Sequence, residues 1–254
     1  MAIEIKPTMN SNKTRQIIAK KCAAFFKALP KKLRGKCFLT GGSAAFLYGS
    51  DRPFSDDIDF MIPLKSVPQF ESSHRIRFKH RKHRWALHKN ERLIKRLESH
   101  LQIKFSYRKH KPVFHSLAAS IALDDISYDL IAKSVIEPIG GGHHKFILFL
   151  IPEVMRKKTT FSLYGQKITC LPKEWLVLTK LLAGRGKELG KYDLYDVEKI
   201  LEKNKDFDFG FFASLVKNFC KPMKTALIIL RHHAEGLKGS KPIKNLRKTL
   251  STLR

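Results

Sequence analysis

The chain has 254 residues, 43% of them hydrophobic, which is enough for the core of one large domain or two small ones. Its formal net charge of +28 favours a phosphate-rich partner such as nucleic acid, although lysines that merely solvate the surface are the alternative explanation. The four scattered cysteines argue against a zinc site or a disulfide framework, and no apolar run is long enough to span a membrane. We therefore expect a cytoplasmic protein without membrane association.

The first third of the chain predicts a helix followed by a compact strand–turn–helix–strand unit. Apolar residues at helical spacing predict an amphipathic helix over 12–29. A short strand over 37–40 then leads into a Gly-Gly-Ser turn at 41–43. A helix is expected to start at residue 44, and a second strand is expected over 58–62.

The rest of the chain begins with an intensely basic stretch, 75–97, which predicts either an insertion or a helical arm. Residues 117–123 and 126–132 predict two strands joined by a turn. A hairpin follows over 159–170, and the periodicity is helical from residue 173 to the end.

These elements predict an α+β fold, with a mixed sheet flanked by helices and a mainly helical C-terminal region. We place a core domain over 1–172, with the basic insertion near 65–113, and a helical domain over 173–254.

The strongest chemical signal is the stretch from Gly41 to Asp59. Gly41 and Gly42 allow the backbone to approach a ligand closely, and Ser43 begins a helix whose free N–H groups favour phosphate. Asp57 and Asp59 alternate around one strand residue, so their side chains point to the same face. This combination predicts a polyphosphate beside paired carboxylates.

A third carboxylate, Asp129, interrupts an apolar strand, where an ionised group is costly unless it is paired or binds a metal. With Asp57 and Asp59 it would complete an oxygen-ligand site suited to Mg²⁺ or Mn²⁺, and it could take the proton from an attacking hydroxyl. An ordinary strand-end residue is the alternative role for Asp129.

Gly-Gly-Ser, Asp-Ile-Asp and the later strand aspartate together resemble the nucleotidyltransferase superfamily related to DNA polymerase beta, over about residues 36–135. The segment LPKEWLVLTKLLAGRGKELGKYDLYDVEKIL resembles the AbiEii-type toxin nucleotidyltransferases. The resemblance implies that Lys180 contacts the triphosphate or the transferred phosphoryl group, as Arg52 would, and that Asp193 orients the lysine or the acceptor. Asp196 is a weaker candidate. The alternatives are a lysine that snorkels to solvent and aspartates that cap a helix.

By this resemblance the chain would move a nucleoside monophosphate from a nucleoside triphosphate to an acceptor hydroxyl. Relatives of this kind imply RNA, tRNA 3′ ends included, as the acceptor, and an antitoxin protein as a partner. Transfer to a protein or a small molecule, or RNA binding without catalysis, remains open.

The basic stretch provides the candidate RNA contacts, through phosphates meeting its cations. The alternative is a solvated helix whose aromatic residues pack inward. The nucleic-acid-binding candidates are Arg75, Arg77, Lys79, Arg81, Lys82 and Arg84.

Overall fold

The computed structural model describes residues 9–52, 57–74, 76–84, 106–108, 111–123, 126–140, 144–189 and 191–253. Its helices are α1 (Met9–Ala28), α2 (Lys31–Arg34), α3 (Gly41–Leu47), η1 (Leu64–Ser66), α4 (Val67–His74), α6 (Pro152–Arg156), α7 (Lys173–Ala183), η2 (Lys187–Leu189), α8 (Asp193–Lys203), α9 (Phe209–Phe219), α10 (Met223–Glu235) and α11 (Lys241–Thr252). Its strands are β1 (Phe38–Leu39), β2 (Asp57–Met61), β3 (Lys79–Arg84), β4 (Ser106–Arg108), β5 (Lys111–Leu123), β6 (Ile126–Ile136), β7 (Phe146–Phe149), β8 (Thr159–Leu163) and β9 (Gln166–Cys170).

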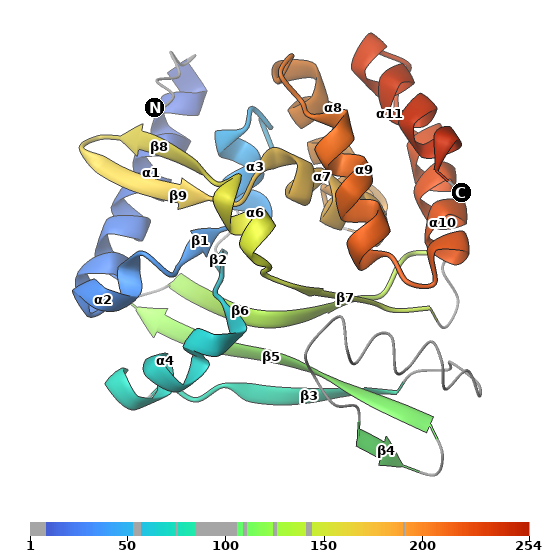
Figure 1. Cartoon of the computed structure of the whole chain (residues 1–254). Coiled ribbons are helices and arrows are strands. Elements are labelled where there is room, and N and C mark those ends of the chain that lie inside the picture. The colour runs from blue at the N-terminus through green and yellow to red at the C-terminus, as the bar shows by residue number, and fades with distance from the viewer. Residues whose placement is uncertain are drawn as a thin grey trace.

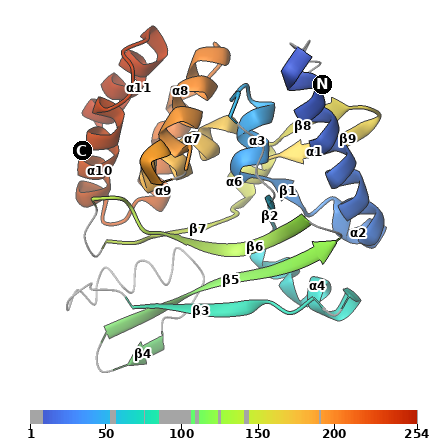
Figure 2. The same ribbon diagram turned by 180° about the vertical axis from the view of Figure 1, so that it is seen from behind.

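The strands form one mixed sheet in the order β3-β5-β6-β2-β1-β9-β8, with β4 on β5 and β7 on β6. The β2–β6 and β1–β9 pairs are parallel, whereas the other pairs are antiparallel. The C-terminal helices gather on one side of the molecule, and β3, β4 and β5 lie at the opposite side (Figures 1 and 2). The predicted α+β architecture, with its mixed sheet and helical C-terminal region, is confirmed.

The opening helix covers one face of the sheet. Ile18, Cys22 and Phe25 are buried along α1, as the apolar spacing predicts. The Phe25 ring stacks on Phe60 of β2 and on Tyr128 of β6, with centroid distances of 4.6 and 5.0 Å. This aromatic contact fixes which face of β2 and β6 points into the core.

The Gly-Gly-Ser segment belongs to a helix rather than to a turn before one, because α3 begins at Gly41 and not at residue 44. Glycine suits the first position of α3 because the φ angle of Gly41 is +65°, a left-handed conformation that residues with a side chain rarely adopt. The two predicted hairpins, β5–β6 and β8–β9, are confirmed.

The basic segment is not a helical arm where the structure describes it. Residues 79–84 form strand β3, which pairs antiparallel with β5 in the main sheet. Ile76 and Phe78 are buried whereas Arg77 and Lys79 are exposed, which is the period of two of a strand. Residues 85–105, which include Trp85, lie outside the described residues.

The helices after residue 172 share their core with the sheet. Trp175 of α7 is fully buried and belongs to the same hydrophobic cluster as Phe25 and Phe60. The boundary proposed between 1–172 and 173–254 stays a prediction. Within the described ranges, no helix is both long and apolar enough to cross a membrane.

The last two helices hold each other by their ends. Arg231 of α10 donates hydrogen bonds to carbonyl oxygens at the end of α11, those of Leu250 and Leu253 among them. Arg247 of α11 donates to carbonyl oxygens at the end of α10 and just after it. Each arginine thus satisfies carbonyl groups that the end of a helix leaves without an intrahelical partner.

Candidate active site

The sheet register brings the predicted aspartates together. In the parallel β2–β6 pair, Asp59 lies beside Asp129, and Asp57 lies beside Ser127. Ile58 of β2 points to the opposite, fully buried face. Side chains alternate along a strand, so the three carboxylates share the face that α1 does not cover.

Asp129 is oriented by a neighbour that the sequence-based site did not include. The Ser120 hydroxyl of β5 donates a hydrogen bond to Oδ1 of Asp129, with an Oγ–Oδ1 distance of 2.6 Å. Ser120 is directly opposite Asp129 in the β5–β6 register. The sequence contained a signal for this contact. In a hairpin with its turn at 124–125, residues at equal distances from the turn are paired, which places residue 120 opposite residue 129.

The pKa of the Asp59 carboxyl group lies above its usual value. Burial raises its pKa to about 6, and the charges of Asp57 and Asp129 add to the rise, whereas Lys180 and Arg52 lower it. A buried carboxyl group beside two others resists ionisation because no positive charge compensates the cluster fully. The site therefore favours a bound cation.

Gly41 is packed directly against Asp59. A Cβ atom at position 41 would lie 2.0 Å from Oδ2 of Asp59, and the φ angle of Gly41 is +65°. Both the contact and the left-handed backbone require glycine. The beginning of α3 is therefore fixed against the carboxylate, with the peptide groups of Gly42 and Ser43 in the same first turn.

Ser43 is buried and not exposed at the surface, where a side chain that binds phosphate would be expected. Its side chain is buried, and its hydroxyl oxygen has no hydrogen-bond partner. An unpartnered buried hydroxyl costs about 1–3 kcal/mol, so a ligand oxygen reaching it would be stabilising. Thr40 and Gly41, not Ser43, line the cavity beside Asp59.

Lys180 sits in a buried network of ion pairs. Its Nζ atom is 2.6 Å from Oδ2 of Asp196 and 3.3 Å from Oδ1 of Asp193. The Ser50 hydroxyl donates to Oδ1 of Asp196 at 2.5 Å. The lysine does not snorkel to solvent, and Asp196, the less favoured candidate, makes the shorter ion pair with it.

Arg52 joins the same network. Its Nη1 atom lies 3.2 Å from Oδ2 of Asp196, and its guanidinium carbon lies 5.0 Å from the centre of the Tyr192 ring. Because it also lowers the pKa of Asp59, its charge reaches the carboxylate site. Arg52 thus contacts Asp196 of α8 and lies near enough to Asp59 for its charge to lower the pKa of that carboxyl group.

A cavity of about 180 Å³ opens between Asp59 and this network. Its walls include Thr40, Gly41 and Met61 on one side and Trp175, Lys180, Arg185 and Asp193 on the other. Arg185, which follows α7, donates to Oδ2 of Asp193 at 2.6 Å and was not predicted. No local pattern marks Arg185, because its role depends on where α7 ends relative to α8.

The carboxylate set fits a divalent cation in its donor chemistry. Oxygen ligands are those that Mg²⁺ and Mn²⁺ prefer, and the raised pKa of Asp59 reflects uncompensated negative charge. Among the described residues, however, no three acidic, histidine or cysteine side chains converge into a finished metal cluster. A cation would therefore draw Asp57, Asp59 and Asp129 closer together than they stand.

The predicted nucleic-acid contacts are only partly visible. Lys79, the first residue of β3, and Arg77, two residues before it, are both exposed. Arg75 lies outside the described residues, as do the side chains of Arg81, Lys82 and Arg84, whose backbone belongs to β3.

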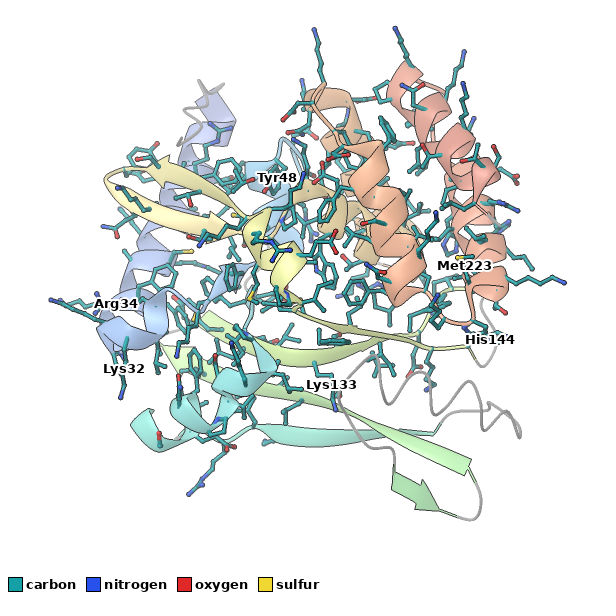
Figure 3. All side chains as sticks on the ribbon, viewed as in Figure 1. Lys32, Arg34, Tyr48, Lys133, His144 and Met223 are labelled. Carbon is teal, nitrogen blue, oxygen red and sulfur yellow. The ribbon has the colours of Figure 1, made fainter. Side chains whose placement is uncertain are left out.

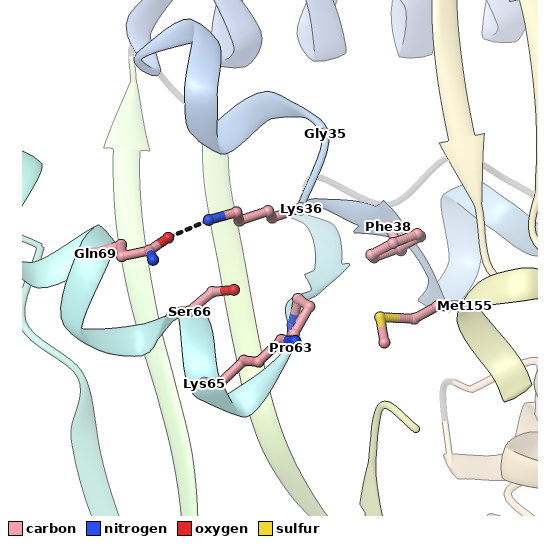
Figure 4. A pocket seen from close by; sticks show the side chains of 8 residues that line it. All are labelled: Gly35, Lys36, Phe38, Pro63, Lys65, Ser66, Gln69 and Met155. Carbon is pink, nitrogen blue, oxygen red and sulfur yellow. Dashed lines mark hydrogen bonds between the residues drawn. The ribbon is translucent and has the colours of Figure 1, made fainter. Parts of the chain in front are cut away.

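A larger cavity, of about 530 Å³, lies at the other end of β2 (Figure 4). Lys36, Lys65, Gln69, Pro63 and Met155 are among its lining residues, and Lys36 donates a hydrogen bond to Gln69. It contains no carboxylate, so cavity size alone would select the wrong place for metal-dependent chemistry. Nearby, Lys32 and Arg34 project outward from α2 (Figure 3).

Similarity to solved structures runs along the whole chain but is low. An antigenic nucleotidyltransferase-like protein from Paracoccidioides brasiliensis is 15% identical, with a TM-score of 0.36 and coverage of 95% of this chain and 93% of that chain. JHP933 from Helicobacter pylori is 13% identical, with a TM-score of 0.33 and coverage of 98% and 93%. No protein-family model matches the sequence, and neither does any curated protein. TM-scores of this size do not assign a reaction, so the function rests on the geometry of the site.

Proposed function

We propose that the chain is a metal-dependent nucleotidyltransferase that moves a nucleoside monophosphate from a nucleoside triphosphate to the terminal hydroxyl of a nucleic acid. The observation that carries the proposal is the register of β2 and β6, which places Asp59 beside Asp129 with Gly41 packed against the Asp59 carboxylate. Carboxylates brought together in this way support a cation-assisted transfer of a nucleotidyl group.

Asp57, Asp59 and Asp129 would hold Mg²⁺ or Mn²⁺, which lowers the pKa of a bound hydroxyl and neutralises the developing charge on phosphorus. Asp129 would accept the proton of the acceptor hydroxyl. The hydroxyl oxygen then forms a bond to the α-phosphorus while the bond to the β-phosphate breaks, and pyrophosphate leaves. Ser120 keeps the Asp129 carboxylate oriented for this step.

The helix start at Gly41 and Gly42 and the buried Ser43 hydroxyl would receive the β- and γ-phosphates, since N–H groups at a helix start favour anions. Lys180 and Arg52 would supply positive charge at the edge of the same site. The 180 Å³ cavity is smaller than the roughly 300 Å³ at which ligand pockets usually begin, so it would hold only part of the nucleotide.

Replacing Asp59 by Asn tests the reaction. We expect the Asp59→Asn variant to lose at least about 100-fold in transfer of labelled nucleotide, because one carboxylate ligand disappears. The assay uses each labelled triphosphate with Mg²⁺ and total RNA. Asp206→Asn, a substitution of an exposed aspartate, should leave transfer unchanged.

Wild-type rates in Asp59→Asn would refute the site. The labelled fraction identifies the acceptor class: label in tRNA supports transfer to tRNA 3′ ends, whereas label in protein or in a small molecule would replace the nucleic-acid acceptor. A chain that binds RNA but transfers nothing with any triphosphate is a binding module only. A toxin role adds the expectation that a partner antitoxin suppresses transfer.

A further inference from the structure

The aspartate face of the sheet continues past the carboxylates onto open, positively charged strands. Lys79 of β3 is directly opposite Ala118 of β5, and Ser120 lies two residues further along β5 on the same face. Ser120 donates a hydrogen bond to Asp129, so Lys79 and the aspartates lie on the same face of the sheet. We call the region formed by Arg77, Lys79, Ala118 and Ser120 the β3–β5 face.

The burial pattern independently fixes which side of the edge strand is free. Ile76 and Phe78 are buried, at 7% and 8% exposure, and anchor the strand from the opposite side. Arg77, Lys79 and Ser120 are all exposed. The segment from Ile76 to Lys79, which leads into β3, therefore exposes its cations and buries its apolar residues. Lys79, the first residue of β3, shares the face of Ala118 and Ser120.

The chemistry of the β3–β5 face suits a polyanion. It presents two cations, a hydroxyl and the small Ala118. The carboxylates next to it are Asp129, which accepts from Ser120, and Glu71 of α4, which accepts from the backbone N–H of Phe78. Small side chains leave the backbone surface low enough for a chain to lie across it. Arginine and lysine in this setting are the contacts that nucleic-acid phosphates receive.

We propose that the acceptor strand of nucleic acid crosses the β3–β5 face, with upstream phosphates on Arg77 and Lys79 and its terminal hydroxyl at Asp129. This inference rests on the proposed function, because Asp129 is the end point of the path. It selects Arg77 and Lys79 from the basic segment as acceptor contacts on the catalytic side of the sheet.

The sheet order sets the length of the path. From β6, which carries Asp129, to β3 there are two strand spacings, β6–β5 and β5–β3, or about 10 Å at roughly 4.8 Å each. Stacked nucleotides rise about 3.4 Å each, so the distance corresponds to about three of them. The cations thus meet phosphates upstream of the terminal nucleotide.

Charge reversal on this face tests the path. The double variant Arg77→Glu/Lys79→Glu should bind a labelled 12-nucleotide single strand on the order of tenfold more weakly than wild type. Its logarithmic salt dependence should be shallower by about 1.4, since two phosphate contacts are lost. Affinity is measured by fluorescence anisotropy over a salt series, with RNA and DNA strands of the same sequence in separate arms.

The matched control is Lys244→Glu/Lys248→Glu, which makes the same change in net charge on exposed positions of α11. Helix α11 lies on the side of the molecule away from β3 (Figures 1 and 2). The control should keep wild-type affinity and salt slope. Equal losses in both double variants, or none in Arg77→Glu/Lys79→Glu, would show that only overall charge attracts the strand and would overturn the path.

Acceptor length provides a second test. The single bridging phosphate of a dinucleotide lies within one nucleotide of the attacking hydroxyl, too near to reach β3. Transfer to a dinucleotide should therefore be unaffected by Arg77→Glu/Lys79→Glu, while KM for the 12-nucleotide acceptor rises at least fivefold. Loss on both acceptors alike would place the cations elsewhere and contradict the proposal.

The two proposals fail in different ways. Asp59→Asn should lose transfer but keep strand binding, whereas Arg77→Glu/Lys79→Glu should lose strand binding but keep Mg²⁺-dependent triphosphate binding. If wild type transfers nothing, the proposed function fails, and the anisotropy comparison still decides whether the strand lies on the β3–β5 face.

Discussion

Gly41 shows how a single residue positions the site. It combines a left-handed φ of +65° with a Cβ direction that points into the Asp59 carboxylate. Gly165, in the β8–β9 turn, has a similar φ of +76°, but a Cβ atom added there would meet no other atom within 4 Å. A side chain at Gly165 would therefore only strain the backbone, whereas a side chain at Gly41 would strain the backbone and also clash with Asp59.

We expect Gly41→Ala to lose about 2–4 kcal/mol of unfolding free energy and to abolish transfer, because the strained backbone adds to a clash with Asp59. Gly165→Ala should lose only about 1–2 kcal/mol and should remain active. Urea denaturation and the transfer assay measure both effects. Equal losses of stability and full activity in both variants would mean that position 41 has room for a side chain.

At the scale of elements, the buried ion pairs link helix α8 to α7. Lys180 on α7 contacts Asp193 and Asp196 in the first turn of α8, and Arg52 reaches Asp196 from the segment after α3. Carboxylates in the first turn also complement the helix dipole. These contacts hold the helices beside the Asp59 cavity.

Asp196→Ala should destabilise the protein by about 3–5 kcal/mol, since it removes the shorter ion pair of the buried Lys180 and the ion pair between Arg52 and Asp196. The matched substitution Asp206→Ala removes the ion pair between Lys173 and Asp206, whose side chain is 76% exposed. It should lower the free energy of unfolding by less than about 1 kcal/mol. Equilibrium urea unfolding measures both. A loss below about 1 kcal/mol in Asp196→Ala would show that the buried network is dispensable.

The sequence predicts elements where local patterns exist and misses long-range partners. Asp57, Asp59 and Asp129 could be placed on strands because apolar residues flank them, and the roles proposed for them remain predictions. Strand β3 was missed because KHRKHR is polar on both sides, so no alternation is visible within it; pairing with β5 decides its structure. The contact of Ser120 with Asp129 follows from the hairpin register, whereas Arg185 acquires its role only through the packing of α7 against α8.

At the scale of the whole molecule, the carboxylate cluster lowers the stability of the folded chain to an extent that depends on pH. The raised pKa of Asp59 means that the folded chain binds this proton more tightly than the unfolded chain, whose carboxyl titrates near 3.8. The uncharged form is thus favoured by folding. The contribution is fully present below pH 4 and is lost as pH rises through about 6.

Without divalent cations, we expect wild type to lose roughly 1–3 kcal/mol of stability relative to Asp59→Asn between pH 4 and pH 7. The difference between the two proteins isolates Asp59 from other titrating groups. Urea unfolding across this range provides the measurement, and Mg²⁺ above pH 6 should restore part of the loss to wild type only. Parallel pH profiles for the two proteins would contradict this assignment of the charge.

Arg231 and Arg247 make α10 and α11 depend on each other, because each arginine satisfies carbonyl groups at the end of the other helix. Deleting α11 would remove Arg247 and uncover the carbonyl groups that close α10, while deleting α10 would do the same to α11. Neither helix can therefore be removed without destabilising the other. Deleting either helix should fray the other, starting from its carbonyl end.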